Sequence, residues 1–228
     1  MKSKKIAALV PMRHHSQRVP RKNYRDLAGK PLFYYIIETL LECKIFDPIA
    51  IDTDSQVILD DVERNFPDIL RVVRPDELRG DQVPMNEILL YDTQEVPADF
   101  YLQTHSTNPF LSAASILKAI RAFMENTTAY DSLFSVTRIS TRLWDEKTQP
   151  INHDPDILLQ TQDLPPIFEE NSCMYIFSAE KLRTRKNRIG EKPMMFEISG
   201  QESLDIDDEN DFLIADLLMR HHKKSKLV

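Results

Sequence analysis

The stretch Ile6-Ala7-Ala8-Leu9-Val10, followed by Pro11, decides the fold class of this chain. Five consecutive apolar residues are typical of a short strand that is buried on both faces, as in a parallel sheet. A polar segment, residues 13–30, follows this strand. Pro31 then precedes Leu32–Leu41, whose apolar spacing predicts a helix with proline at its start.

Short apolar runs and helical periodicity keep alternating along the chain. Further strands are expected at Pro48–Asp52, Ile69–Val73, Phe100–Gln103, Ser132–Thr137, Cys173–Phe177 and Met194–Ile198. Further helices are expected at 57–66, Met85–Gln94, 112–123 and Asp207–Arg220. This alternation predicts an α/β fold, a mostly parallel, doubly wound, Rossmann-like sheet with helices on both faces. Ligands of such sheets bind beyond the carboxyl ends of the strands.

Residues 139–170 interrupt this pattern. The part Ile139–Pro166 is rich in Thr, Asp, Gln and Pro and has no clear period. A structureless run of this length is uncommon inside a compact domain. We therefore expect a single domain over residues 1–228, with residues 139–170 as a small excursion that serves dimerisation or the sugar pocket.

Composition excludes several classes of protein. The chain has 228 residues, with 36 acidic and 29 basic residues and a net charge of -7. That balance argues against a general nucleic-acid binder, which is usually basic. The first apolar run has five residues, too few for a signal peptide, and no run approaches the ~18 residues that span a bilayer. With Cys43 and Cys173 read as buried thiols, we expect a cytoplasmic protein without a membrane partner.

Four cations, Arg13, Arg18, Arg21 and Lys22, follow the first strand closely. Together with the Ser16 hydroxyl and backbone N–H groups they suit a triphosphate, although a solvated basic loop would have the same composition. The chain has only four glycines, where average usage of about 7% predicts roughly 16. None of them lies between Pro11 and Asn23, so a phosphate here would be bound mainly by side chains.

The spacing of these residues resembles a family signature. The match runs Ala8-Leu9-Val10-Pro11-x-Arg13-x-x-Ser16-x-Arg18-Val19-Pro20-x-Lys22-Asn23 and continues with Leu27-x-Gly29-Lys30-Pro31-Leu32. It is similar to the signature of the sugar-acid cytidylyltransferases, which include the acylneuraminate cytidylyltransferases, or CMP-sialic acid synthetases. Later segments match in the same order: Asp52–Ser55, Arg74–Asp81, Thr107–Phe110, Glu170–Ile176 and Ser203–Asp207.

The resemblance implies a nucleotidyltransferase that joins CTP to a sialic-acid-like (nonulosonic) sugar acid and releases pyrophosphate. It implies a homodimer and a Mg²⁺ (or Mn²⁺) cofactor. The catalytic residues implied are Arg13, Lys22 and Asp207. The nucleotide-binding residues implied are Arg13, Ser16, Lys22, Asn23, Arg74 and Asp81, and the metal ligands are Asp205 and Asp207.

The metal assignment also has support from the residues themselves. Alternate residues of an extended segment face the same way, so Asp205 and Asp207 can share one hard cation through carboxylate oxygens. The alternative is that both belong to an acidic first turn of the last helix, which complements the helix dipole.

The resemblance places the sugar pocket at Gln103, His105, Glu169, Asn171 and Tyr175. His105 aligns best with a glutamine of the family, and Gln103 is the alternative in a shifted register. Glu169 stands near a position where sialic acid enzymes have an arginine, and a glutamate there would repel a sugar carboxylate. Ser172 replaces a family glycine. The resemblance therefore leaves the identity of the sugar acid open.

Two other functions remain possible from the sequence. Asp52-Thr53-Asp54 is an Asp-x-Asp pair after a strand, the kind of pair that holds the metal of a nucleotide-sugar in glycosyltransferases. The departures at His15, Gln17 and Glu169 also allow a non-catalytic relative that binds a nucleotide or a sugar.

Overall fold

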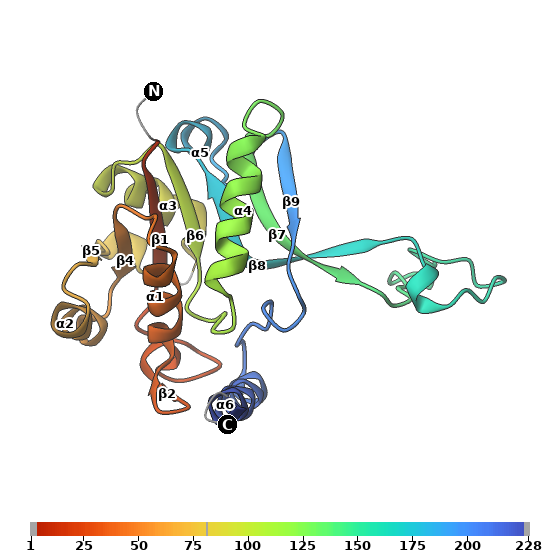
Figure 1. Ribbon diagram of the computed structural model, residues 1–228, viewed down its shortest axis with the longest axis horizontal. Helices are drawn as coiled ribbons and strands as arrows, with labels where there is room; N and C mark the ends of the chain where they lie inside the picture. The colour runs from red at the N-terminus through yellow and green to blue at the C-terminus, as the bar shows by residue number, and fades with distance from the viewer. Residues whose placement is uncertain (1–3, 81, 226–228) are drawn as a thin grey trace.

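The computed structural model describes residues 4–80 and 82–225. Seven strands form one sheet in the order β5-β4-β1-β6-β8-β7-β9 (Figure 1). Their bounds are β1 (Ile6–Met12), β4 (Ile49–Thr53), β5 (Leu70–Val73), β6 (Phe100–Thr104), β7 (Ser132–Ile139), β8 (Ile167–Phe177) and β9 (Pro193–Glu197). All neighbours run parallel except β8, which is antiparallel to β6 and β7. The expectation of a mostly parallel α/β sheet is confirmed.

Helices cover both faces of this sheet. The apolar sides of α1 (Leu32–Cys43), α2 (Gln56–Asn65) and α4 (Ala113–Glu125) pack on one face, and α3 (Met85–Glu95) and α5 (Ala179–Arg185) pack on the other. Each of α2, α4 and α5 begins after a serine whose hydroxyl accepts a backbone N–H of the first turn, at Ser55, Ser112 and Ser178.

A smaller apolar cluster joins the C-terminal helix to the loop after β1. It packs α6 (Glu209–Ser225) against the short strands β2 (Asp26–Leu27) and β3 (Lys30–Pro31) and the start of α1. α6 begins two residues later than expected, because the Asp208 carboxylate accepts the N–H groups of Asn210 and Asp211 and so caps the helix. Asp207 therefore precedes the helix, beside the loop that follows β1.

The excursion is a two-stranded arm. β7 and β8 continue past the sheet as an antiparallel pair with Ile139 opposite Ile167, and the arm projects away from the body (Figure 1). β8 begins at Ile167, six residues earlier than the expected strand, so residues 167–170 belong to a paired strand and not to the irregular part. Three short 3-10 turns, Lys22–Tyr24, Asp76–Leu78 and Thr161–Asp163, complete the elements described.

A bulge marks the point where the arm leaves the sheet. Phe134 pairs with Tyr175, but Val136 pairs with Glu170, so Ser135 of β7 stands opposite four residues of β8 and the register shifts by three residues. The Asn171 side chain holds this bulge, because it accepts from the Ser135 hydroxyl at 2.6 Å and donates to the Thr137 hydroxyl at 2.9 Å. Ser172 has φ 57°, which explains why a glycine would suit this position.

The scarcity of glycine shows in the backbone. Within the described residues, six non-glycine residues have positive φ, namely Arg21, Ala28, Lys44, Thr148, Ser172 and Lys186, against one glycine, Gly29. Left-handed conformations are costly for residues with a Cβ. The chain therefore carries strain at turns where most proteins place glycine.

Replacing Lys44 by glycine should stabilise the protein. Lys44 is exposed and ends α1 at φ 55° and ψ 27°, the conformation that favours glycine after a helix. We expect Lys44→Gly to raise the free energy of unfolding by about 1 kcal/mol, measured by urea denaturation. Lys44→Ala keeps the Cβ and serves as the control. A Lys44→Gly variant no more stable than Lys44→Ala would contradict the assignment of strain.

Candidate active site

A pocket of about 550 Å³ opens at the carboxyl ends of β1 and β6. This is where ligands bind in doubly wound sheets. Its walls come from three segments: the loop after β1, the segment before and at the start of α3, and the loop after β6. The lining residues are Pro11, Met12, Arg13, His15, Ser16, Gln17, Arg18, Lys22, Asn23, Arg74, Gly80, Gln82, Val83, Met85, Ile88, His105, Ser106 and Thr107. Arg13, Arg18 and Lys22, three of the four cations predicted to bind phosphate, thus line one cavity together with Ser16, whereas Arg21 is exposed and lies outside this lining.

Asn23 fixes the loop that forms one wall of the pocket. Its side-chain amide donates to the carbonyl oxygen of Arg13 at 2.7 Å, and its amide oxygen accepts from the Ser106 hydroxyl at 2.7 Å. Asn23 and Ser106 are both buried. A buried polar bridge therefore ties the loop after β1 to the loop after β6. The predicted contact of Asn23 with the nucleotide stays a prediction, while its bond to the loop is observed.

The beginning of the same loop is tied to the end of β4. The backbone N–H of His14 donates to the Asp54 carboxylate at 2.6 Å, and the His14 ring lies 2.7 Å from the Ser55 hydroxyl. These contacts place Arg13 on the pocket wall, with Ser16 beside it. In the absence of glycine, side chains hold the loop in shape.

Lys22 links this loop to the segment before α6. Its ammonium donates to the carbonyl oxygen of Ile206 at 2.6 Å. Burial lowers the pKa of Lys22, and the carboxylates of Asp205 and Asp207 act to raise it. Both carboxylates therefore lie close to the ammonium, although they are more than 180 residues away in the sequence. The structure brings together a cation and two acids that the sequence analysis assigned to one reaction.

Asp205 and Asp207 differ in their surroundings. Asp207 is exposed and pairs with the Arg18 guanidinium at 2.8 Å. Asp205 is half-buried, and its Oδ1 atom has no hydrogen-bond partner among the described residues. Burial raises the pKa of Asp205, and the charge of Asp207 raises it further. A divalent cation would supply the missing partner and offset the repulsion between the two carboxylates.

These two carboxylates do not form a complete protein metal site. Over residues 4–80 and 82–225, no group of three or more His, Cys, Asp or Glu side chains is placed to hold a metal ion. A cation at Asp205 and Asp207 would need further oxygen ligands, which substrate phosphates and water provide in many Mg²⁺ sites. The donor set therefore fits a metal that is bound together with a nucleotide.

Arg74 lies at the floor of the pocket in a buried ion pair. Its guanidinium is 2.8 Å from the Asp52 carboxylate, and both side chains are at most 2% exposed. Asp92 on α3 is also buried, and neither of its carboxylate oxygens has a partner in the described part of the chain. Burial raises the pKa of Asp92, and the charge of Asp52 adds to the rise. Sequence analysis missed Asp92, because nothing in its helical pattern marks it as buried.

The Asp-x-Asp pair is engaged inside the protein. Asp52 is bound to Arg74, and Asp54 accepts the N–H of His14. This arrangement differs from an open metal pair, so it gives no support to the glycosyltransferase alternative. Asp81, assigned to the nucleotide site by the resemblance, lies outside the described residues.

Three of the predicted sugar-site residues lie together. The Gln103 amide nitrogen is 2.9 Å from the His105 ring, and Tyr175 lies beside them on β8, where it pairs with Gln103. Arg188 joins this group: its guanidinium donates to the Gln103 side-chain oxygen at 2.6 Å and lies 3.5 Å from the Tyr175 ring centre. We name Gln103, His105, Tyr175 and Arg188 the Gln103 cluster.

The other two residues lie on the arm side of β8. Asn171 directs its amide into the bulge, as described above, and Glu169 is exposed and pairs with Thr137 at the base of the arm. Both are therefore separated from the Gln103 cluster in this chain. Arg188 was missed because it stands in a run of basic residues with no distinctive spacing.

His105 should remain neutral over the physiological pH range. Burial, together with the charges of Arg188 and Lys22, lowers its pKa to about 3. The unfolded chain takes up this proton near pH 6.5. The free energy of unfolding should therefore fall as the pH falls from about 6.5 towards 3. We expect His105→Gln to flatten this part of the urea-denaturation pH profile, whereas His221→Gln, on α6, should leave it unchanged. Parallel profiles for wild type and His105→Gln would refute the proposed neutral state.

Comparison with known proteins agrees with this geometry. A family model described as cytidylyltransferase matches residues 7–218. N-acylneuraminate cytidylyltransferase A of Danio rerio is 26% identical over 94% of this chain and 51% of its own length. The N-acylneuraminate cytidylyltransferase of Escherichia coli is 25% identical over 98% of this chain and 54% of its own length. The chain thus spans about half the length of these two relatives.

A relative of similar length is CMP-N,N′-diacetyllegionaminic acid synthase of Legionella pneumophila, 27% identical over 97% of this chain and 99% of its own. Among solved structures, a CMP:2-keto-3-deoxy-manno-octonic acid synthetase complexed with CTP superposes with a TM-score of 0.70 at 15% identity. That alignment covers 96% of this chain and 99% of the synthetase. The likeness to the synthetase concerns the fold, and the family match over residues 7–218 settles the membership: the chain belongs to the cytidylyltransferase family.

Proposed function

We propose that this protein joins CTP to a nonulosonic or related sugar acid and releases pyrophosphate. The observation that carries the proposal is the meeting of Lys22 with Asp205 and Asp207 at the edge of one pocket. Cations beside a pair of carboxylates suit a triphosphate bound with a metal ion. The family membership and the activities for which its relatives are named support the same reaction.

In the proposed reaction the anomeric hydroxyl oxygen of the sugar acid attacks the α-phosphorus of CTP. A bond from that oxygen to phosphorus forms, the bond to the bridging oxygen of pyrophosphate breaks, and the hydroxyl proton passes to a base. Such phosphoryl chemistry needs positioning and charge neutralisation more than covalent catalysis. Arg13 and Lys22 would neutralise the phosphates, and Arg74, at the pocket floor, would seat the cytidine.

We propose Mg²⁺ (or Mn²⁺) as the cofactor. Asp205 and Asp207 would hold it, because the unpartnered Asp205 oxygen and the neighbouring carboxylate offer the hard oxygen ligands that these ions prefer. When bound, the ion would stabilise negative charge on the phosphate oxygens. Lys22 would keep the Asp205–Asp207 segment against the phosphate loop through its bond to Ile206.

The non-catalytic alternative differs in one measurable respect. A relative that only binds its ligands would give a calorimetric signal with CTP but would release no pyrophosphate with any sugar acid. We favour catalysis because Arg13 and Lys22 line the pocket and the carboxylates of Asp205 and Asp207 lie close to the Lys22 ammonium. These are the residues to which the family resemblance assigns phosphate and metal.

We also propose that the arm formed by β7 and β8 mediates a homodimer. The arm exposes large apolar side chains at Trp144, Ile151, Ile157 and Leu158, with Leu158 88% exposed. Apolar side chains gathered at such a tip are typical of an interaction surface. Within the described residues no helix is long and apolar enough to cross a membrane. A cytoplasmic location is part of the proposal.

Removing the charge of Arg13 or of Asp207 should abolish activity. We expect Arg13→Ala and Asp207→Asn each to lower kcat/KM by at least about 100-fold, because charge on the transferring phosphate would lose a partner. The measurement is CTP-dependent pyrophosphate release over a panel of nonulosonic acids and shorter sugar acids. Asp208→Asn removes the adjacent carboxylate but keeps a good helix cap, and it should retain activity. Full activity of Arg13→Ala or Asp207→Asn would exclude the proposed roles.

Charging the tip of the arm should weaken the dimer. We expect Leu158→Asp to raise the dimer dissociation constant at least about tenfold, since a buried charge opposes association. Sedimentation equilibrium measures the change. Val57→Asp, at a 51% exposed residue of α2, is the control and should leave assembly unchanged. A monomeric wild type, or a dimer insensitive to Leu158→Asp, would count against the arm as the interface.

A further inference from the structure

Arg188 is a half-buried cation that contacts Gln103, and Gln103 in turn contacts His105 in the lining of the active-site pocket. Arg188 follows α5 in the sequence, and within the Gln103 cluster its guanidinium contacts the Gln103 side chain and the Tyr175 ring. His105, a member of the same cluster, lines the pocket. The Arg188 charge lowers the pKa of His105, which places the guanidinium within electrostatic range of the pocket wall.

The charge of Arg188 has no counter-ion in the part of the chain that the structure describes. Among the described residues no carboxylate oxygen lies within 4.0 Å of its guanidinium, whereas Arg74 is 2.8 Å from Asp52. The groups that touch it are the Gln103 amide and the Tyr175 ring, both neutral. Burial lowers the pKa of Arg188, which means that its charged form is under-solvated. Half-buried charges without a partner cost free energy, and an anionic ligand would offset that cost.

Glu170 approaches this cluster but does not neutralise it. Its carboxylate accepts the Tyr175 hydroxyl at 2.5 Å, on the far end of the ring from the backbone. Its charge acts on Arg188 only as a secondary influence on the pKa. Tyr175 thus stands between the acid and the guanidinium. A planar guanidinium that keeps free donors can bind a carboxylate through two parallel hydrogen bonds.

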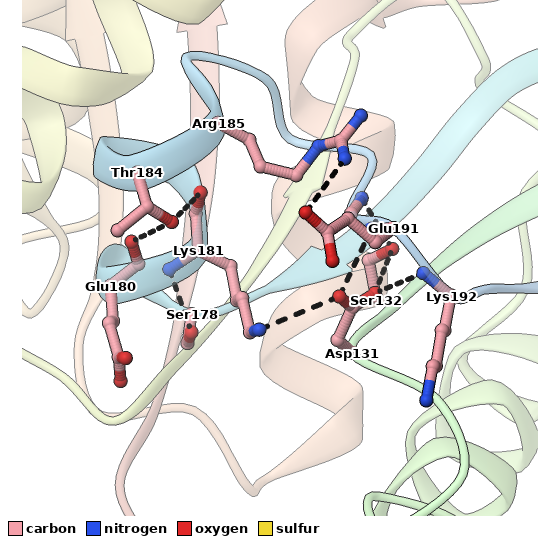
Figure 2. Close-up of polar contacts among 10 residues, drawn as sticks. Asp131, Ser132, Ser178, Glu180, Lys181, Thr184, Arg185, Glu191 and Lys192 are labelled. Atoms are coloured by element: carbon pink, nitrogen blue, oxygen red, sulfur yellow. Dashed lines mark hydrogen bonds and ion pairs between the residues drawn. The ribbon is translucent and has the colours of Figure 1, made fainter.

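The backbone around Arg188 is fixed on both sides. The Arg188 N–H donates to the Asn86 side chain on α3 at 3.1 Å, and the Gly190 N–H donates to the Ser132 hydroxyl at 2.8 Å. Figure 2 shows how Asp131 completes the anchor: its carboxylate accepts the N–H groups of Glu191 and Lys192, each at 3.0 Å. Lys181 of α5 reaches the same carboxylate at 3.7 Å.

Gly190 is required by this anchor. A Cβ at residue 190 would lie 2.1 Å from the Asp131 Oδ1 atom, so no larger residue fits without moving the loop. This chain has few glycines, even at left-handed turns, but it does have a glycine at position 190. The loop that carries Arg188 is therefore held in one conformation before any ligand binds, and such preorganisation lowers the cost of binding.

We propose that Arg188 binds the carboxylate of the sugar acid and selects acids over neutral sugars. The inference deepens the proposed function and depends on it. A sugar carboxylate needs a positive charge beside it. In this chain β8 cannot supply that charge, because Glu169 and Glu170 are both acidic, so the inference assigns it to the loop after α5. Arg13 and Lys22 face the phosphates in the same proposal, so Arg188 is the cation available for a second anion.

The test compares each acid with its carboxamide. The probes are N-acetylneuraminic acid, N,N′-diacetyllegionaminic acid and 2-keto-3-deoxy-manno-octonic acid, each with the matching carboxamide. For the acid that the wild type turns over best, we expect Arg188→Gln to raise KM at least about tenfold while the KM for CTP stays unchanged. We expect the same variant to lose most of its preference for acid over carboxamide, and Arg188→Lys to retain part of it.

Arg185→Gln is the matched control. Arg185 lies three residues earlier, and its exposed side chain pairs with exposed Glu191 (Figure 2), so this variant should keep the wild-type preference. An equal loss for acid and carboxamide in Arg188→Gln would mean that Arg188 only packs against Tyr175, and would overturn the inference. Unchanged KM for the acid would do the same. If Arg188→Gln does not fold, the acid preference of Arg188→Lys decides: a preference equal to the wild type's overturns the inference, and a reduced one supports it.

Different results would overturn the proposed function and the proposed role of Arg188. A wild type that releases no pyrophosphate with any acid would overturn the proposed function. A wild type that turns over, combined with an Arg188→Gln variant that discriminates normally, would overturn only the role of Arg188.

Discussion

A buried bridge, from the Arg13 carbonyl through the Asn23 amide to the Ser106 hydroxyl, holds the pocket together. It ties the loops after β1 and β6, two adjacent parallel strands whose carboxyl ends meet at the crevice. Phosphate loops commonly depend on glycine to bring backbone N–H groups close to a ligand. This loop contains none, so side chains hold its backbone, and the cations Arg13, Arg18 and Lys22 line the pocket.

Elsewhere in the fold, too, residues other than glycine occupy backbone positions that favour glycine. Ser172 takes a left-handed conformation in the bulge where the arm leaves the sheet, and Asn171 is committed to holding that bulge. The residue assigned by resemblance to the sugar pocket thus stabilises the junction between sheet and arm. Gly190 is the contrasting case, because its missing Cβ admits the Asp131 carboxylate that anchors the next loop. Local polar contacts therefore fix both the bulge of β8 at Asn171 and Ser172 and the loop after α5 that carries Arg188. Both segments lie next to residues of the proposed sugar site.

Much of the fold followed from sequence. Strands buried on both faces, such as Ile6–Met12, and helices with a single apolar side have strong periodic signals. The length of β8 did not follow, because its outer half pairs only with β7 in the arm and alternates weakly. Buried polar pairs also escaped prediction. Asp52 could be read as a metal ligand until the sheet order placed β4 next to the segment that carries Arg74.

Site residues could be predicted where their spacing along the chain matches a known pattern. They could not be predicted where their role depends on contacts made only in the folded protein. Arg13 and Lys22 were identified by their spacing after the first strand, and the pocket does gather them. Arg188 and Asp92 have no such spacing, and only packing reveals that Arg188 is a half-buried cation with no ion-pair partner among the described residues and that Asp92 is a buried acid.

The most direct measurement is a crystal structure of the protein with CTP and Mg²⁺. We predict that the triphosphate lies against Arg13 and Lys22, with the metal at Asp205 and Asp207 and the cytosine beside Arg74. A triphosphate bound away from the loop after β1, or a metal bound to neither carboxylate, would contradict the proposed active site.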